Sequence, residues 1–354
     1  KSSNKTTYNG NYGLNAQWTV YNGSKRLKTI EQEKLNNRVA DLDVATSEND
    51  IEQSIAQVYI QILYAAESVK VNENTLQVSE AQRDRGKQLL DAGSIARSDY
   101  AQLEAQVSTD RYQLVTAQAT LQDYKLQLKQ LLELDGEQEM QVYLPALGDE
   151  NVLSPLPTKT DVFRSAVALR PEIEASKLSV EASELGIGIA KSGYLPSVSL
   201  TAGIGTNHTS GSDFTFGEQV KNGWNNSIGL SVSVPIFNNR QTKSAVQKAK
   251  LQYETSMLSL LDEQKTLYKT IEGLWLDANS AQQRYAAANE KLKSTQISYE
   301  LISEQFNLGM KNTIELLTEK NNLLQAQQEQ LQAKYMAILN MQLLKFYQGD
   351  QLAI

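Results

Sequence analysis

The sequence predicts a mainly helical fold with a few amphipathic strands, built twice from one structural unit. The chain aligns with itself without a gap when it is shifted by 216 residues, so that Gly93 falls on Gly309 and Asp99 on Glu315. Such a regular offset indicates an internal duplication. Long stretches without proline follow short segments of alternating polarity, and these two patterns are typical of long helices and of strands.

The composition argues against several classes of function. The 354 residues include 34 Lys and Arg and 41 Asp and Glu, for a formal net charge of −7, which disfavours a nucleic-acid binder with a basic surface. There is no cysteine and only one histidine, His208, so disulfides and clusters of thiolate or histidine ligands are excluded. Because no nucleophile–base set or phosphate-binding loop appears, we expect no enzyme activity, no cofactor and no metal site.

The self-alignment divides the chain into two repeats. We assign residues 1–138 to a first repeat, 139–158 to a proline-containing linker and 159–354 to a second repeat. Residues 160–216 have no counterpart, because their partners would precede residue 1. We therefore expect the first repeat to be incomplete at its N-terminus, with roughly 60 or more further residues upstream in the natural protein.

Three segments alternate strictly between apolar residues and small polar ones. They are residues 14–21, 197–205 and 227–237. Strands of about 9–11 residues are long enough to cross a bilayer when they are tilted. The strands alone leave open an amphipathic sheet on a soluble core, but a face exposed to solvent would carry more Lys and Glu.

Each repeat continues from a strand into a very long helix. Residues 24–90 contain no proline and one glycine, Gly86, and as a helix would span roughly 100 Å. Apolar residues recur at 4-3 spacing, which is typical of a coiled-coil seam. The seam positions are Ile51, Ile55, Val58, Ile62, Ala65 and Val69, their duplicates Leu267, Ile271, Leu274, Ala278, Ala281 and Tyr285, and, after Gly93, a series that begins Leu103, Val107, Asp110 and Leu114. We also expect helices at 159–169 and 171–192 and a loop at 206–223.

Four short motifs follow one another in these elements. Arg170-Pro171-Glu172-Ile173 begins a predicted helix, residues 193–200 (GYLPSVSL) enter a strand, residues 234–238 (VPIFN) leave the paired strand, and residues 306–309 (FNLG) end a long helix. In this order, and together with the duplication, they resemble the TolC-like outer-membrane efflux proteins, the outer membrane factors of Gram-negative bacteria. The resemblance covers essentially the whole chain.

This resemblance implies a homotrimer with two parts. The strands of all chains would form one transmembrane β-barrel in the lipid bilayer, and the long helical hairpins would form an α-barrel through the periplasm. The implied function is a passive outer-membrane channel of a tripartite pump that exports small molecules or drugs, with a periplasmic adaptor (membrane fusion) protein and an inner-membrane pump of the RND or ABC type as partners. A duct for type I protein secretion is the alternative, and a soluble coiled-coil scaffold is disfavoured by the strands.

The resemblance also assigns roles to the turns between the long helices. Gly93 and Gly309, with Phe306 and Leu308 beside the second turn, would form helix tips that contact the adaptor. A glycine suits such a turn, because it adopts a positive φ without strain.

A periplasmic gate is implied just beyond the tips. Asp99 and Glu315 each lie six residues after their glycine, and three copies would form a ring of carboxylates around the pore. Lys311 would tie the tips together by pairing with Asp99. An alternative reading stays open for Glu315, because it lies three residues after Asn312 and fits a helix-capping box.

Aromatic residues flank the predicted strands. They include Trp18, Tyr194, Trp224 and Phe237. This placement suits an aromatic girdle at the two membrane–water interfaces, whereas scattered aromatic residues without a shared role are the alternative.

Overall fold

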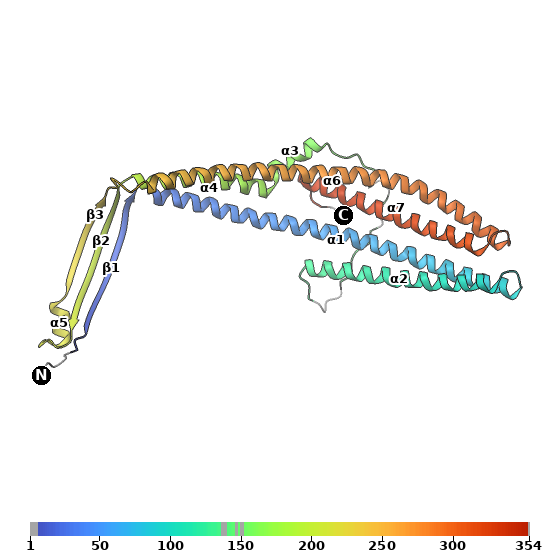
Figure 1. The fold of residues 1–354 in the computed structure, drawn as a ribbon, viewed down its shortest axis with the longest axis horizontal. Coiled ribbons are helices and arrows are strands. Elements are labelled where there is room, and N and C mark those ends of the chain that lie inside the picture. The colour runs from blue at the N-terminus through green and yellow to red at the C-terminus, as the bar shows by residue number, and fades with distance from the viewer. Residues whose placement is uncertain (1–5, 136–139, 146–147, 149–151, 353–354) are drawn as a thin grey trace. The chain divides into compact units, whose positions relative to one another are not determined.

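The computed structural model is mostly helical, with one small sheet (Figure 1). It describes residues 6–135, 140–145, 148 and 152–352, so that residues 139, 146–147 and 149–151 of the predicted linker lie outside the described residues. The elements are β1 (Asn9–Asn22), α1 (Lys25–Asp91), α2 (Arg97–Leu131), α3 (Lys159–Leu169), α4 (Pro171–Lys191), the 3-10 turn η2 (Ser192–Tyr194), β2 (Ser197–Thr209), α5 (Phe216–Asn222), β3 (Asn225–Ser233), α6 (Gln241–Asn307) and α7 (Thr313–Gln348).

The duplication is visible in the order of the elements. The series β1–α1–α2 recurs as β3–α6–α7, and α1 and α6 have the same length of 67 residues. The chain forms two compact units, one of residues 1–43 and 172–263 and the other of residues 44–171 and 264–354. Each unit therefore combines segments from both repeats.

The first unit contains an antiparallel sheet in the order β1-β2-β3. Its register places apolar residues in line across the strands, as in the row Trp18, Leu200 and Leu230. The next row on the opposite face consists of Gln17, Thr201 and Gly229. The predicted division into an apolar face and a small polar face is confirmed.

The sheet differs from the prediction at several points. The strand expected at 14–21 extends over Asn9–Asn22. The strand expected at 227–237 ends at Ser233, just before Pro235, whose nitrogen has no hydrogen to donate to a sheet. A bulge at Val20 places Tyr21, not Val20, opposite Val198 on the apolar face. The loop expected at 206–223 instead contains the end of β2 and the short helix α5, which begins at a capping box between Thr215 and Glu218.

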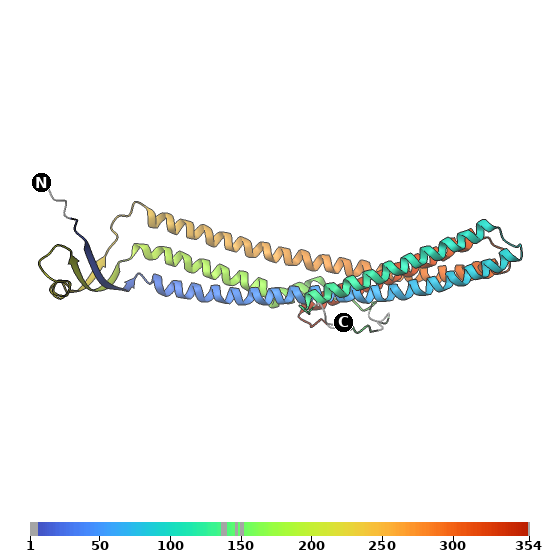
Figure 2. The ribbon, with the colours of Figure 1, turned by 90° about the horizontal axis from the view of Figure 1, so that it is seen from below.

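Helix α4 packs between the first parts of α1 and α6 within this unit (Figure 2). The amide of Gln32 in α1 donates to the carbonyl of Ala182 at 2.7 Å. On the other side, the hydroxyls of Ser183 and Ser256 lie 2.8 Å apart. A Cβ on Gly188 would meet the end of the Lys28 side chain at 2.9 Å, so this glycine leaves room for the neighbouring helix.

The second unit contains two helical hairpins and the segment that joins the repeats (Figure 1). Most of the predicted seam lies in its core, where Ile62, Ile271 and Tyr285 are buried, but its first position, Ile51, is 49% exposed. The joining segment is held against α6, because the indole of Trp275 donates to the carbonyl of Pro157 at 3.0 Å. No described helix is long and apolar enough to cross a membrane.

The Arg170-Pro171 motif connects α3 to α4 at a well-defined packing site. The guanidinium of Arg170 lies over the rings of Phe346 and Tyr347, with 4.3 and 4.0 Å to the ring centres. A cation over an aromatic face is attracted by the ring quadrupole. Proline suits the first position of the following helix, where an N–H would have no partner within the helix.

Candidate functional site

Both long helices end in the same type of turn. Gly93 and Gly309 have φ values of +73° and +75°, in the left-handed region that glycine adopts without strain. Two backbone hydrogen bonds of 2.8–2.9 Å close each turn in the Schellman pattern. Their donors and acceptors are Gly93 to Leu90, Ser94 to Leu89, Gly309 to Phe306 and Met310 to Gln305.

The side chains around the second tip divide into a buried and an exposed set. Phe306 is only 3% exposed and packs beneath the turn. Leu308 and Met310 are 69% and 71% exposed. Of the two side chains expected to contact an adaptor, Leu308 is thus presented on the surface, whereas Phe306 supports the turn from inside.

Glu315 caps the helix that follows the second tip. Its carboxylate accepts the backbone N–H of Asn312 at 3.1 Å, and its own N–H donates to the Asn312 side chain at 2.9 Å. The Lys311 ammonium donates to the same carboxylate at 2.5 Å. These contacts, with Lys311 first, lower the pKa of Glu315 below its ordinary value of 4.5, so the group is charged at neutral pH.

Asp99 occupies the equivalent position in the first repeat with weaker support. Its carboxylate accepts the N–H of Ala96 at 3.3 Å, but alanine has no side-chain acceptor to return the bond. The Lys311 ion pair within the chain is with Glu315, whereas the resemblance implies a pair with Asp99. The single chain thus contains the helix cap, and a carboxylate ring around a pore remains a prediction about several chains.

The four aromatic residues expected to form a girdle are all exposed. Trp18 and Trp224 are 61% and 55% exposed, and Tyr194 and Phe237 are exposed as well. One end of the sheet is where β2 begins and β3 ends. Tyr194 and Phe237 lie just beyond this end, and Trp18 lies in the fourth row from it. Trp224 precedes β3 at the other end of the sheet. The set therefore lies toward both ends of the sheet, and a girdle at the membrane–water interfaces stays a prediction.

Comparison with known proteins identifies the family. The family model described as "Outer membrane efflux protein" matches residues 1–133 and 162–349, which is most of the chain. The chain belongs to the outer membrane efflux protein family. The resemblance seen in the four sequence motifs is thereby confirmed.

Two relatives illustrate the match in sequence. The outer membrane efflux protein BepC of Brucella suis is 25% identical over 290 residues, or 81% of this chain and 60% of BepC. The outer membrane protein TolC of Escherichia coli is 24% identical over 335 residues, or 91% of this chain and 66% of TolC. The chain thus spans less than two thirds of the length of these relatives.

Solved structures show the same fold. A structure of CusC superposes with a TM-score of 0.81 at 19% identity and covers 98% of this chain and 79% of CusC. VceC from Vibrio cholerae gives a TM-score of 0.78 at 15% identity and covers 98% of this chain and 88% of VceC. The predicted fold class, of long helical hairpins joined to strands as in outer membrane efflux proteins, is confirmed.

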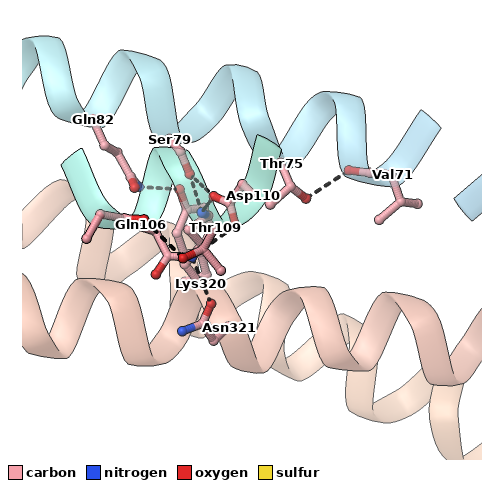
Figure 3. A network of polar contacts seen from close by, with 11 residues as sticks. Val71, Thr75, Ser79, Gln82, Gln106, Thr109, Asp110, Lys320 and Asn321 are labelled. Carbon is pink, nitrogen blue, oxygen red and sulfur yellow. Dashed lines mark hydrogen bonds and ion pairs between the residues drawn. The ribbon is translucent and has the colours of Figure 1, made fainter. Parts of the chain in front are cut away.

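A buried polar cluster in this family member was not predicted. Lys320 and Asp110 form an ion pair with side chains 3% and 1% exposed, and Ser79 contacts both (Figure 3). Burial lowers the pKa of Lys320, while Asp110 opposes the shift. The sequence offered one signal, because Asp110 occupies a seam position between Val107 and Leu114 where an apolar residue is usual.

Proposed function

We propose that this chain forms part of the wall of a passive export duct in the outer membrane of a Gram-negative bacterium, with no catalytic reaction of its own. The observation that carries the proposal is the two-faced sheet. Ile228, Leu230 and Val232 on its apolar face are 84%, 69% and 59% exposed, while the opposite face carries small polar residues such as Thr201 and Ser231. An apolar face suits lipid and a small polar face suits a water-filled lumen.

The sheet also supports assembly into a homotrimer. In the part of the chain that the structure describes, β1 and β3 each pair only with β2, which leaves one open edge on each. Unpaired backbone groups at such an edge cannot lie in lipid, so a membrane-spanning sheet must close. Further copies of the chain, as in the trimer that the resemblance implies, would close it into a barrel.

The helical hairpins fit the second part of such a duct. Exposed Leu308 and Met310 at the second tip offer an apolar contact for a periplasmic adaptor protein. An inner-membrane pump of the RND or ABC type would supply the energy, because the chain has no nucleotide-binding motif of its own.

The cargo could belong to either of two classes that the relatives represent. Several relatives are named for efflux, as BepC is. Another relative, 22% identical over 83% of this chain, is the alkaline protease secretion protein AprF of Pseudomonas aeruginosa. We propose small-molecule efflux and keep protein secretion as the alternative, because the inner-membrane partner would select the cargo.

Ion flow through the reconstituted full-length protein tests the duct and its gate together. In a planar bilayer with a salt gradient and no energy source, we expect discrete conductance with a preference for cations. Glu315→Gln removes one charge per chain at the tip and should lower that preference, since ringed carboxylates concentrate cations within a Debye length of about 8–10 Å. Acidification through the lowered pKa of Glu315 should do the same in the wild type, and should have a smaller effect on Glu315→Gln, which has lost that carboxylate.

The outcomes separate the duct from the gate. A folded, inserted protein that never conducts would contradict the duct. Conductance with unchanged reversal potential in Glu315→Gln would instead limit Glu315 to its capping role, because glutamine can still accept the N–H of Asn312.

A further inference from the structure

Three helices of the first unit meet the sheet at a joint that carries exposed basic side chains. Helix α1 begins at Lys25, α4 ends at Lys191 and α6 begins at Gln241, all beside the end of the sheet where β2 begins and β3 ends (Figure 1, Figure 2). The basic side chains exposed at this joint are Lys25, Arg26, Lys191, Arg240 and Lys243. We call these five residues the joint cluster.

The joint cluster has no acidic counterpart in the segments that form it. Residues 1–30, 185–212 and 219–253 contain no Asp or Glu, although the whole chain has a net charge of −7. In the described part of the chain, none of the ion pairs involves a member of the cluster. Copies in a symmetric ring bring the same segments together, so these segments add no carboxylate on assembly.

Helix stability does not explain the basic residues at the starts of α1 and α6. The N-terminus of a helix carries partial positive charge, which favours acidic side chains and disfavours basic ones. Helices α2, α3, α4, α5 and α7 each have an acid in the first turn. In contrast, α1 and α6 have none, and Arg26 and Lys243 lie there instead. The same exception in both repeats indicates an anionic partner outside the chain.

The joint cluster adjoins exposed apolar side chains. Ile236 and Phe237, just before the basic start of α6, are 96% and 85% exposed. At the end of β1, the guanidinium of Arg26 donates to the carbonyl of Thr19 at 3.2 Å, next in sequence to Trp18, which is 61% exposed. Aromatic side chains followed by cations are typical of the boundary between the acyl chains and the phosphate groups of a membrane.

We propose that the joint cluster binds the phosphate groups of anionic phospholipids in the periplasm-facing leaflet of the outer membrane. This inference rests on the proposed function, in which the sheet lies in lipid and the helices lie in the periplasm. The exposed apolar side chains contact acyl chains, and the Lys and Arg side chains donate to phosphate oxygens. An anionic headgroup suits the cluster better than a zwitterionic one, because the joint supplies cations without acids. The cluster thereby fixes the depth of the sheet in the membrane.

Lipid binding by the full-length protein tests this inference. Native mass spectrometry counts the lipids bound to each trimer, with phosphatidylglycerol and phosphatidylcholine of the same acyl chains as probes. The joint variant, Arg240→Gln with Lys243→Gln, removes two charges per chain and should not weaken α6, since its N-terminus disfavours cations. The matched control, Lys248→Gln with Lys250→Gln, removes the same charge from exposed positions roughly 10 Å further along α6.

We expect the wild type to bind phosphatidylglycerol more tightly than phosphatidylcholine. The joint variant should lose roughly 5- to 25-fold of this preference, because each basic residue near an anionic surface contributes about fivefold in affinity. The control variant should keep most of the wild-type preference, and added salt should weaken the preference in the wild type. Equal binding of the two lipids by the wild type, or equal losses in the two variants, would overturn the inference.

Particle mass and conductance of the same samples separate this inference from the proposed function. The wild type and both variants should form trimers that conduct ions in a planar bilayer. A wild type that neither forms trimers nor conducts would contradict the proposed function. Trimers that conduct but bind both lipids equally would leave the export duct in place and overturn only the role of the joint cluster.

Discussion

At the residue scale, the helix tips depend on two glycines whose positive φ no other residue adopts as easily. Gly309→Ala should destabilise the protein by about 1–2 kcal/mol, because a Cβ is disfavoured in left-handed backbone. No atom lies within 4 Å of the position of that Cβ, so the cost is conformational rather than steric. Gly273→Ala is the matched control: it also has open space, but it lies inside α6 and should stabilise by about 0.5–1 kcal/mol. Thermal unfolding measures both variants. Equal changes in melting temperature for Gly309→Ala and Gly273→Ala would contradict the role of Gly309 as a residue that needs a positive φ.

A second prediction at this scale concerns the ion pair between Lys320 and Asp110. Removing one partner, by Lys320→Met or by Asp110→Leu, leaves a buried charge unpaired and should cost about 3–5 kcal/mol. The double variant removes both charges and should be close to wild type in stability. Urea unfolding of all four proteins measures the coupling. If the two single effects simply add in the double variant, the residues do not interact.

At the element scale, the sheet presents two faces that should tolerate substitution unequally. Val232→Arg places a charge on the apolar face and should cost about 2–4 kcal/mol if the residue lies near the bilayer midplane. Ser231→Arg, its neighbour on the polar face, should be milder and should alter conductance instead. The fraction of each variant that inserts into liposomes, and its stability after refolding in detergent, are compared with those of the wild type. Equal losses at both positions would mean that the sheet does not contact lipid.

The elements were predictable wherever the deciding signal was local. Helix α3 was predicted at 159–169 and lies at Lys159–Leu169, because Pro157 and Pro171 lie just outside its two ends. The bulge at Val20 was missed, since alternation along one strand does not reveal the hydrogen-bond register with its neighbour. Helix α5 was missed although Thr215 and Glu218 formed a recognisable capping box.

The candidate site was predictable only in part for a related reason. Gly93 and Gly309 could be found because a helix turn with glycine is a local pattern. The contact of Asp110 with Lys320 joins residues 210 positions apart, so the anomalous polar residue was visible in its seam but its partner was not. The family resemblance assigned Asp99 as the partner of Lys311. In the chain, Lys311 instead pairs with the nearby Glu315.

At the scale of the whole molecule, the proposed function depends on assembly. A chain with an exposed apolar face and open sheet edges is incomplete in a membrane, and the alternating repeats suit a closed ring of hairpins. Family membership supports the same architecture. The trimer links the proposals on the sheet and the gate, since the closed sheet and the carboxylate ring exist only when copies assemble.

The mass of the intact assembly shows whether three chains form one particle. Native mass spectrometry of the full-length protein, released from detergent micelles under gentle activation, counts the chains in each particle. We predict particles of three chains after the detergent has been stripped away. A predominant monomer whose sheet is fully formed, as judged by circular dichroism of the same sample, would contradict the trimer.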